Sequence, residues 1–365
     1  MSREIAGERG RQADREIEVL VVGTFGGGGI HQYIEEQLDR FSEEIVVSTF
    51  DMVAAPSGSG PAWFLGSALR SLSAALAFPF QSRPDVVHVH ASHRFSFYRA
   101  APYVLFAAYV WRCPVVVHIH GSSFDEFAQS SDRGVRAVQD LVFDAADRII
   151  VLSEYWREVV ADRADPGKLR VFPNAVDPDE YTPAYGTDPP RIVFVSNLYE
   201  RKGVETLVGA LDRLADRDHR FRAEIAGKGP LAEQVEGLAR RHEAVQYHGY
   251  VSEERKRELL EQGTIYVLPT HAEGLPIAML EAMAGGNAIV STTVGAIPEV
   301  IGEDNGRLVE PGDEAALADA LSELLDAPAT ATEMGRRNRR LVETEYNWDH
   351  VQTRLERLYV EELLD

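Results

Sequence analysis

The fold is decided by one stretch of the sequence, Ile265-Tyr-Val-Leu268-Pro-Thr-His-Ala-Glu273-Gly-Leu-Pro276-Ile-Ala-Met-Leu-Glu281-Ala-Met-Ala-Gly-Gly-Asn-Ala288-Ile-Val-Ser291. It begins and ends with a short apolar run of strand length, and a longer apolar pattern lies between them. Pro276 suits the first turn of a helix, where its missing N–H costs little. A strand, a helix and a second strand in this order predict a parallel sheet covered by helices.

The same alternation extends over all 365 residues. The predicted strands of the first half are 17–22, 45–49, 86–90, 115–120, 149–152 and 169–172, and those of the second half are 192–195, 223–226, 245–247, 265–268, 288–291 and 307–309. Between the halves, residues 177–190 contain four prolines and no periodicity, which is typical of a linker. We therefore predict an α/β protein with two Rossmann-like, doubly wound domains.

The predicted domain bounds are a polar tail over 1–16, an N-terminal domain over 17–180, a C-terminal domain over 181–345, and a C-terminal segment over 346–365. This last segment is amphipathic, and we expect a helix over 348–364 that packs back across the domain boundary. Glycines and polar residues follow the predicted strands in both halves. Because open α/β sheets bind ligands at the carboxyl ends of their strands, we expect both domains to face one cleft.

Charge excludes one class of partner. The net charge of −21 makes nucleic acid a poor ligand, since phosphates require clustered Lys and Arg. Only four lysines occur, at positions 168, 202, 228 and 256. We interpret this composition as adaptation to high salt, which screens the repulsion among surface acids. The alternative is GC-rich codon usage that favours arginine.

Cysteine usage and hydropathy bear on location. Cys113 is the only cysteine, so intramolecular disulfides and CxxC metal sites are excluded. The N-terminal tail has no apolar core, and no apolar run reaches the roughly 20 residues that span a bilayer. We expect a cytoplasmic protein. Two apolar segments, 63–80 and 100–111, are interpreted as core helices, with peripheral contact to the inner membrane face as the alternative.

Two motifs of the first half have a weaker meaning. The glycine-rich run 23–31 follows the first strand, and Gly26, Gly27 and Gly28 would let backbone amides approach a phosphate or an acceptor. Neither the GxGxxG pattern nor the P-loop pattern fits it, and a flexible turn is the alternative.

Histidines gather at the ends of two predicted strands. His88 and His90 share one strand face, as do His118 and His120, so neighbouring strands could assemble a metal site. No nearby DxD or HExxH motif supplies further ligands, so we expect no metal site and take His118 as a core residue. His120 ends its strand and is expected to point into the cleft.

Glu273 and Glu281 are the most specific signal. They lie eight residues apart across a helix start, where each carboxylate can accept hydrogen bonds from a sugar diol. The amides of Gly274 and Leu275 would be free to bind phosphate oxygens. Two solvated glutamates beside a helix start are the alternative interpretation.

The run 268–286 closely resembles the EX7E signature of the retaining family 4 glycosyltransferases. The resemblance extends to Pro173-Asn-Ala-Val-Asp177, Arg201-Lys202-Gly203, Gly227-Lys-Gly-Pro230 and His248-Gly249. It implies a GT-B fold, a nucleotide-sugar donor in the C-terminal half, an acceptor site in the N-terminal half and no metal or other cofactor.

The resemblance also assigns roles. Glu281 would bind the ribose hydroxyls, Glu273 would contact the transferred sugar, and Lys202 with Arg201 would neutralise the diphosphate in place of a metal. His120 would lie beside the reacting carbon, and Gly227 would belong to the donor site. One departure is Ser196-Asn197-Leu198, where the family has a GRL triplet, so one expected guanidinium is absent.

The function implied is transfer of a sugar from a nucleoside diphosphate to a hydroxyl of a glycan or lipid-linked acceptor, with retained anomeric configuration. No matched Asp or Glu is an obvious covalent nucleophile, which favours front-face displacement. The alternatives are a GT-B epimerase or hydrolase, a non-catalytic partner protein that binds nucleotide sugar, and a metal hydrolase built on the histidines.

Overall fold

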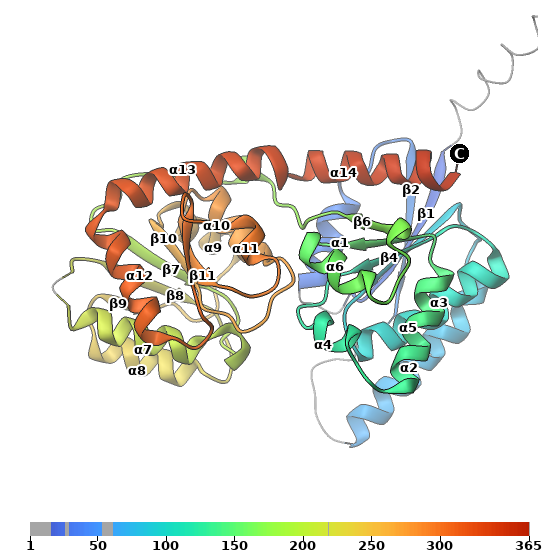
Figure 1. Ribbon diagram of the computed structural model, residues 1–365, viewed down its shortest axis with the longest axis horizontal. Helices are drawn as coiled ribbons and strands as arrows, with labels where there is room; N and C mark the ends of the chain where they lie inside the picture. The colour runs from blue at the N-terminus through green and yellow to red at the C-terminus, as the bar shows by residue number, and fades with distance from the viewer. Residues whose placement is uncertain (1–15, 26–28, 53–60, 218, 365) are drawn as a thin grey trace, which may run out of the picture. The chain divides into compact units, whose positions relative to one another are not determined.

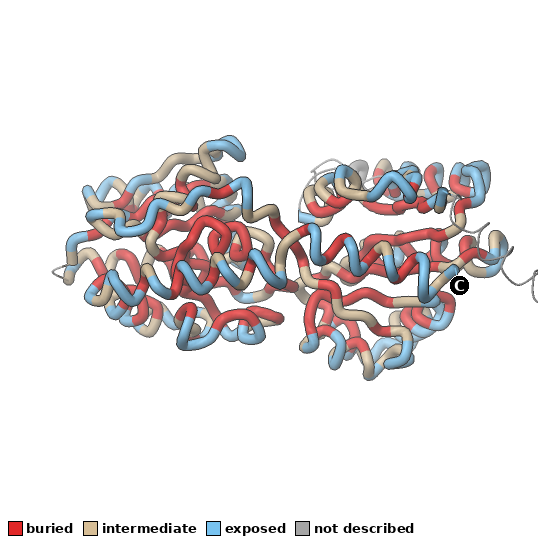
Figure 2. Tube along the Cα trace, turned by 90° about the horizontal axis from the view of Figure 1, so that it is seen from above, coloured by how far each residue is buried: buried red, intermediate tan, exposed pale blue. Residues whose placement is uncertain are grey.

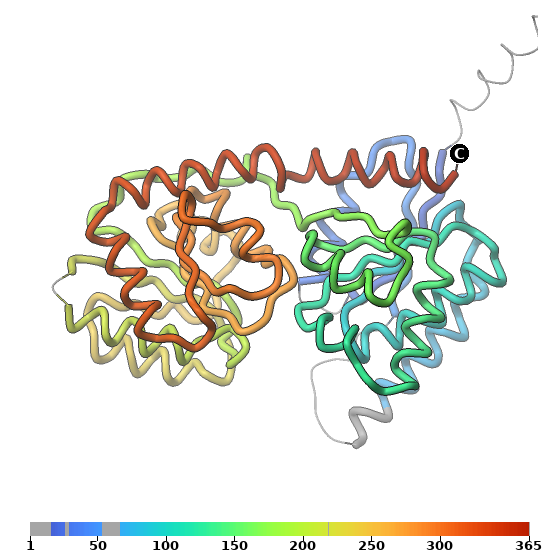
Figure 3. The backbone as a smooth tube through the Cα atoms, in the orientation of Figure 1, coloured from blue at the N-terminus to red at the C-terminus, as the bar shows by residue number. Residues whose placement is uncertain are grey.

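The computed structural model describes residues 16–25, 29–52, 61–217 and 219–364. The chain forms two compact units. Unit 1 comprises the chain up to Val151, Arg157–Val171 and the chain from Gln352 onward, and unit 2 comprises Leu152–Trp156 and Phe172–Val351. In Figure 3 the last part of the red C-terminal segment, from Gln352 onward, lies beside the blue-to-green part of the chain with which it forms unit 1.

Unit 1 contains a parallel sheet of six strands in the order β2-β1-β3-β4-β5-β6. Its strands are β1 (Ile17–Gly23), β2 (Ile45–Asp51), β3 (Val86–Ala91), β4 (Val115–Ile119), β5 (Arg148–Val151) and β6 (Leu169–Val171). Its helices are α1 (Gly29–Leu38), α2 (Pro61–Ala77), η1 (Phe78–Phe80), α3 (Phe95–Phe106), η2 (Ala107–Trp111), α4 (Phe124–Ala128), α5 (Arg133–Ala145), α6 (Glu154–Ala161), whose first turn belongs to unit 2, and η3 (Pro166–Lys168).

Unit 2 contains a second parallel sheet of six strands, in the order β12-β11-β10-β7-β8-β9. Its strands are β7 (Arg191–Val195), β8 (Arg222–Ala226), β9 (Val245–Tyr247), β10 (Ile265–Leu268), β11 (Ala288–Thr292) and β12 (Gly306–Val309). The helices that follow are η4 (Pro178–Glu180), η5 (Glu200–Lys202), α7 (Val204–Ala215), α8 (Ala232–Arg241), α9 (Glu253–Glu261), α10 (Ile277–Ala284), α11 (Ile297–Val300), α12 (Glu314–Asp326), α13 (Pro328–Glu345), α14 (Trp348–Arg357) and η6 (Leu358–Leu364), of which η6 and the end of α14 belong to unit 1.

Burial on both faces explains why these strands could be recognised in the sequence. Strands β3, β4, β10 and β11 are buried along their whole length, as parallel strands covered by helices must be. Figure 2 shows the interior of each unit in red and exposed segments in pale blue at its surface. All predicted strands are confirmed within one or two residues at their ends, and so is the α/β fold class.

Local signals set the helix starts. Asp132 accepts hydrogen bonds from Gly134 N (2.8 Å) and Val135 N (3.0 Å) at the start of α5, because a short side-chain oxygen satisfies the first amides of a helix. Asn347 does the same for His350 N (2.8 Å) at the start of α14, where the sequence predicts a helix.

Two segments differ from simple expectation. Residues 177–190, which read as a linker, are bound to unit 2: Ala184 N donates to Glu261 O (2.8 Å), and Arg257 pairs with Glu180 (2.6 Å). The interpretation of 63–80 as a core helix is wrong for its described second half, where leucines are exposed at helical spacing. Segment 100–111 is largely core, except at its C-terminal end.

The acidic composition leads to a prediction about salt. We expect the melting temperature to rise between low salt and about 2 M KCl, where the Debye length falls to about 2–3 Å and repulsion among 58 acids facing 37 bases is screened. Thermal unfolding followed by circular dichroism measures this. A flat or falling curve would favour codon usage as the origin of the composition.

Candidate donor-binding site

The strand order of unit 2 creates one position suited to a ligand. From β7 the chain adds β8 and β9 on one side and then β10, β11 and β12 on the other. Ligands of doubly wound sheets bind at the carboxyl ends of the two strands where this order reverses, here β7 and β10. The loop after β7 carries Lys202 and the loop after β10 carries Glu273, so the topology brings these residues together.

Gly203 allows the two loops to touch. Its φ is +70°, and a Cβ at this position would lie 1.7 Å from the carbonyl oxygen of Pro269. Only glycine fits both the left-handed conformation and this close approach. Hydrogen bonds then join the loops, because Arg201 O accepts from Thr270 Oγ1 (2.9 Å) and from His271 N (2.8 Å). The glycine after Lys202 therefore fixes the lysine beside the β10 loop.

Glu273 is held by a set of donors. Its side chain is 8% exposed, and its Oε1 accepts from Lys202 Nζ and from Thr270 Oγ1 (3.2 Å). Arg201 Nη1 lies 3.7 Å from the same oxygen and donates to Ala272 O (2.7 Å). A buried carboxylate is costly unless it is paired and hydrogen bonded, so these contacts hold Glu273 in a defined position.

Glu281 has a lysine partner of its own. Its side chain is 8% exposed on α10, and its Oε1 lies 2.7 Å from Lys256 Nζ of α9, which also contacts Glu253 (2.5 Å). Burial by itself would lower the pKa of Lys256, but the Glu281 and Glu253 carboxylates outweigh burial and raise it. Glu273 and Glu281 thus each face an ammonium group, and Lys256 joins the candidate site through its contact with Glu281.

This pairing leads to a prediction for donor binding. We expect Lys256→Met and Glu281→Gln each to raise the donor Kd by about tenfold or more, the range for losing a hydrogen bond to a charged group. The turnover number should change little, because a contact far from the reacting bond is equal in the ground and transition states. Titration calorimetry and steady-state kinetics measure the two quantities, with Lys168→Met as the matched control in unit 1. An unchanged Kd in both variants would remove this pair from the donor site.

The start of α10 offers backbone amides. The sequence suggested that Pro276 lies in the first turn of the helix. In the structure Pro276 precedes the helix, and α10 begins at Ile277. In the described part of the chain, the amides of Gly274 and Leu275 donate to no acceptor. Their carbonyls are fixed from behind, by Trp156 Nε1 (3.0 Å) and by Asn174 Nδ2 (2.6 Å) respectively. Free amides before a helix favour an anion.

The loops after β7 and β8 also approach each other closely. Gly227 has a φ of +146°, and a Cβ there would lie 1.8 Å from the carbonyl oxygen of Ser196. Its amide donates to Gly249 O (2.8 Å), so Gly227 contributes space rather than a free donor. Asn197, where the resemblance leads one to expect arginine, is exposed next to this contact.

The sequence did not point to several of these partners. Lys256 and Trp156 come from segments far from Glu273 and Glu281 in the chain, and Thr270 lies within the run 268–286 but was given no role. Glu299 was given no role either. It accepts hydrogen bonds from Ser153 Oγ (3.2 Å) and from the first amides of α6, where a carboxylate is stabilised by the helix N-terminus.

The histidines of unit 1 form a buried cluster. His88 and His90 of β3 lie beside His118 of β4, and His90 is paired in register with His118. His88 Nδ1 contacts the Tyr359 hydroxyl of η6, and His88 Nε2 lies 3.3 Å from His118 Nδ1. His120 Nε2 lies 2.9 Å from His90 Nδ1, so His120 is bonded within the cluster.

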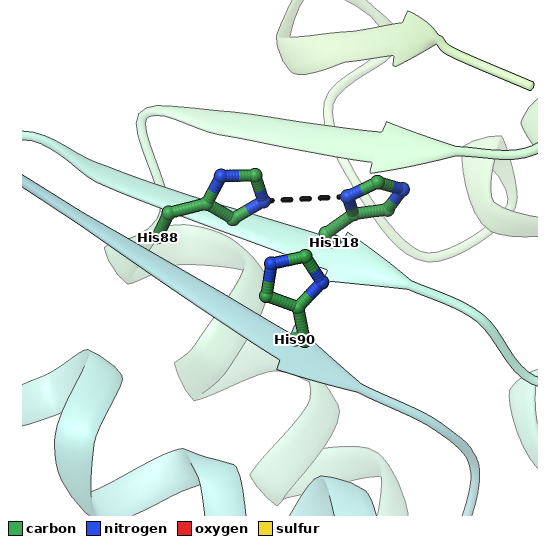
Figure 4. Close-up of side chains that lie close together, drawn as sticks. All are labelled: His88, His90 and His118. Atoms are coloured by element: carbon green, nitrogen blue, oxygen red, sulfur yellow. Dashed lines mark hydrogen bonds between the residues drawn. The ribbon is translucent and has the colours of Figure 1, made fainter. Parts of the chain in front are cut away.

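The cluster geometry bears on the metal hypothesis. Nitrogens of His88, His90 and His118 all lie within 4.8 Å of one another, and Figure 4 shows the three rings around one point. Ligands at the Zn–N distance of a tetrahedral site would be about 3.3 Å apart. The rings of His88 and His90 are stacked at 4.4 Å and 10°, so their in-plane lone pairs run parallel rather than converging. The arrangement fits hydrogen-bonded imidazoles better than metal ligands.

Burial determines the charge state of these rings. It lowers the pKa of His88 and of His120 to about 3 and the pKa of His90 and of His118 well below the usual value, and neighbouring imidazoles add to the effect on His88, His90 and His118. An N–H···N contact needs one ring nitrogen that donates and one that accepts through its lone pair. A doubly protonated imidazole has no free lone pair and cannot be the acceptor.

The role of the glycine-rich run stays a prediction, because Gly26, Gly27 and Gly28 lie outside the described residues.

Comparisons with known proteins bear on the family and the fold of the chain. Residues 9–180 match the family model described as Glycosyltransferase Family 4, and residues 189–327 match the model described as Glycosyl transferases group 1. The fold is that of GT-B glycosyltransferases. One match lies in each half of the chain.

Relatives and solved structures extend the comparison. Glycogen synthase of Mycobacterium tuberculosis is 28% identical over 76% of this chain and 69% of its own length. A human phosphatidylinositol N-acetylglucosaminyltransferase chain is 31% identical over 76% of this chain, which spans 58% of that relative. Sucrose-phosphate synthase of Thermosynechococcus elongatus has a TM-score of 0.75 at 19% identity, covering 94% of this chain and 98% of its own. Anabaena HepE in complex with UDP-glucose has a TM-score of 0.72 at 15% identity, covering 93% and 98%.

Proposed function

We propose that this chain transfers a hexose from a nucleoside-diphosphate sugar to an acceptor hydroxyl, with retention of anomeric configuration and without a divalent metal. One observation carries the proposal: two buried glutamates, each paired with a lysine, lie where the strand order of unit 2 reverses. The match of each half to a glycosyltransferase family model supports the reaction class. The UDP-glucose bound to Anabaena HepE supports a nucleotide-sugar donor.

Each group then has a role in the reaction. Glu281, positioned by Lys256, accepts hydrogen bonds from the ribose hydroxyls, and Lys202 with the Gly274 and Leu275 amides neutralises the diphosphate. The bond between C1 of the sugar and the diphosphate oxygen breaks, and C1 forms a bond to the acceptor oxygen on the same face. The leaving phosphate takes the acceptor proton. Glu273 contacts the sugar, where its negative charge stabilises the positive charge that develops near C1.

Basic side chains in place of a metal lead to a direct test. Donor turnover should persist in EDTA, because Lys202 and Arg201 stabilise the leaving group themselves. The assay follows release of the nucleoside diphosphate from a panel of nucleotide sugars, with and without glycan and lipid-linked acceptors, and NMR assigns the anomeric configuration of the product. Activity that disappears in EDTA and returns with manganese would contradict metal independence.

The same assay separates the rival functions. Release that no acceptor accelerates would indicate a hydrolase, and a donor converted to its epimer would indicate an epimerase. Donor binding without any turnover would indicate a non-catalytic partner protein.

In the described part of the chain no helix has the length and hydropathy needed to cross a membrane.

A further inference from the structure

Unit 1 contains a long stretch that is nearly free of acids. Between Asp51 and Asp125 the only acidic residue is Asp85, although the chain average of 58 acids in 365 residues would place about twelve there. The same stretch contains five arginines, at positions 70, 83, 94, 99 and 112. It therefore carries positive charge in a protein whose net charge is −21.

This stretch also exposes an unusual share of apolar surface. Of the fifteen large hydrophobic side chains exposed in the described residues, eight lie between positions 69 and 110. Leu69, Leu72 and Leu76 follow one another at helical spacing along α2, and Phe80 continues the line in η1. Leu76 is 65% exposed and Phe80 is 87% exposed. Figure 1 shows α2 on the outside of unit 1, next to α3.

The exposed line of α2 and η1 lies next to a second exposed segment, η2. The Phe78 ring packs on Trp111 at 4.7 Å and on Phe106 at 5.8 Å, which places the end of α2 and η1 beside η2. Tyr109 and Val110 of η2 are exposed. We call Leu69, Leu72, Leu76, Phe80, Tyr109 and Val110 the α2–η2 surface.

Arginines lie around the α2–η2 surface. Arg70 is on α2 itself, and Arg83 Nη2 donates to Arg112 O (3.2 Å), which joins the chain after η1 to the chain after η2. All three arginines are exposed, and none forms an ion pair with a carboxylate in the described part of the chain. Among the described residues these three cations are therefore available to an external anion.

We propose that the α2–η2 surface docks on an anionic phospholipid bilayer. A line of leucines and aromatic rings suits the boundary between headgroups and acyl chains, and unpaired arginines beside it attract lipid phosphates. Because screening at physiological salt limits charge interactions to about 8 Å, the acids elsewhere on the protein do not cancel this local attraction. A basic protein partner would need acidic side chains on this surface. Because Asp85 is the only acid between Asp51 and Asp125, the charge of this stretch favours an anionic partner such as lipid.

Docking is independent of the proposed transfer reaction, since the α2–η2 surface belongs to unit 1 and the glutamate–lysine pairs belong to unit 2. The full chain is floated with vesicles of phosphatidylcholine alone or of phosphatidylcholine mixed with phosphatidylglycerol. We expect binding to the anionic vesicles and weaker binding to the neutral ones. The double variant Leu72→Asp/Leu76→Asp should lower the partition coefficient by at least about tenfold.

Matched variants make the test specific. Leu141→Asp changes an exposed leucine of α5 that has Asp140 and Asp144 beside it, and should leave partitioning unchanged. Arg70→Gln should weaken binding about fivefold at low salt, whereas Arg133→Gln on α5 should not. Unchanged melting and unchanged donor binding show that the variants are folded.

Three results would overturn the docking proposal. The first is a lack of vesicle binding by the native chain, and the second is an equal loss of binding in Leu141→Asp. The third is a dimer in lipid-free solution that Leu72→Asp/Leu76→Asp dissociates, which would assign the surface to self-association. A failure of donor binding with intact vesicle binding would contradict the transferase proposal alone.

Discussion

Replacing Lys202 with alanine is expected to slow sugar transfer by about 30-fold to 900-fold, which corresponds to about 2–4 kcal/mol of transition-state stabilisation. The departing nucleoside diphosphate gains negative charge as the bond to C1 breaks, and Lys202 is the ammonium that Gly203 fixes beside Glu273. Steady-state kinetics of nucleoside diphosphate release measures the loss.

Neighbouring variants divide the roles. Arg201→Ala should cost much less than Lys202→Ala, because the Arg201 side chain is 46% exposed and exposed charges contribute little. Glu273→Gln should reduce turnover more than donor affinity, the reverse of Glu281→Gln. Asn197→Arg should be neutral or should raise donor affinity if the exposed position admits the guanidinium. A fully active Lys202→Ala enzyme would show that the diphosphate binds elsewhere.

Unit 1 is expected to lose stability in mild acid. His88, His90 and His118 are neutral in the folded state and titrate near 6.5 when unfolded, so the unfolded chain binds more protons at any pH below about 6.5. Stability from these rings is fully present above that pH and is lost as the pH falls. Three imidazoles lower the free energy of unfolding by about 4 kcal/mol per pH unit, and His120 adds to this slope.

At this slope, counted from pH 6.5, a total stability of about 5–15 kcal/mol is used up within about one to four pH units, so we expect unit 1 to unfold between about pH 5 and about pH 3. Circular dichroism and chemical denaturation between pH 7.5 and about pH 4.5 measure the slope, and the other titratable side chains packed on the rings are Tyr33 and Tyr359. His118→Leu should reduce the slope by about one proton. A slope of one proton or fewer in the native chain would mean that the rings accept protons without unfolding.

The strands could be predicted because parallel strands buried on both faces leave a local mark. Val115–Ile119 and Ile265–Leu268 are short β-branched or apolar runs, and each precedes a polar or glycine-rich turn. The glutamate pair could be predicted for a similar reason, since both residues lie on one short segment around a helix start.

The remaining features depend on contacts between distant parts of the chain. No spacing rule links Lys256 to Glu281, which come together because α9 packs against α10. Trp156 binds Gly274 across 118 positions, and the segment Leu152–Trp156 joins unit 2 although its neighbours belong to unit 1. The exposed leucines of α2 were misread because an apolar helix has the same pattern whether protein or another apolar surface covers it.

The central claim is that unit 2 binds a nucleoside diphosphate through Lys202 and Glu281 without metal, and titration calorimetry in EDTA tests it most directly. UDP, GDP and ADP are titrated into the native chain, Lys202→Ala, Glu281→Gln and the control Lys168→Ala. The prediction is that at least one nucleotide binds with a Kd in the micromolar range, that Lys202→Ala and Glu281→Gln each weaken it by about tenfold or more, and that Lys168→Ala does not. Binding that requires a divalent cation, or that both site variants leave unchanged, would contradict the claim.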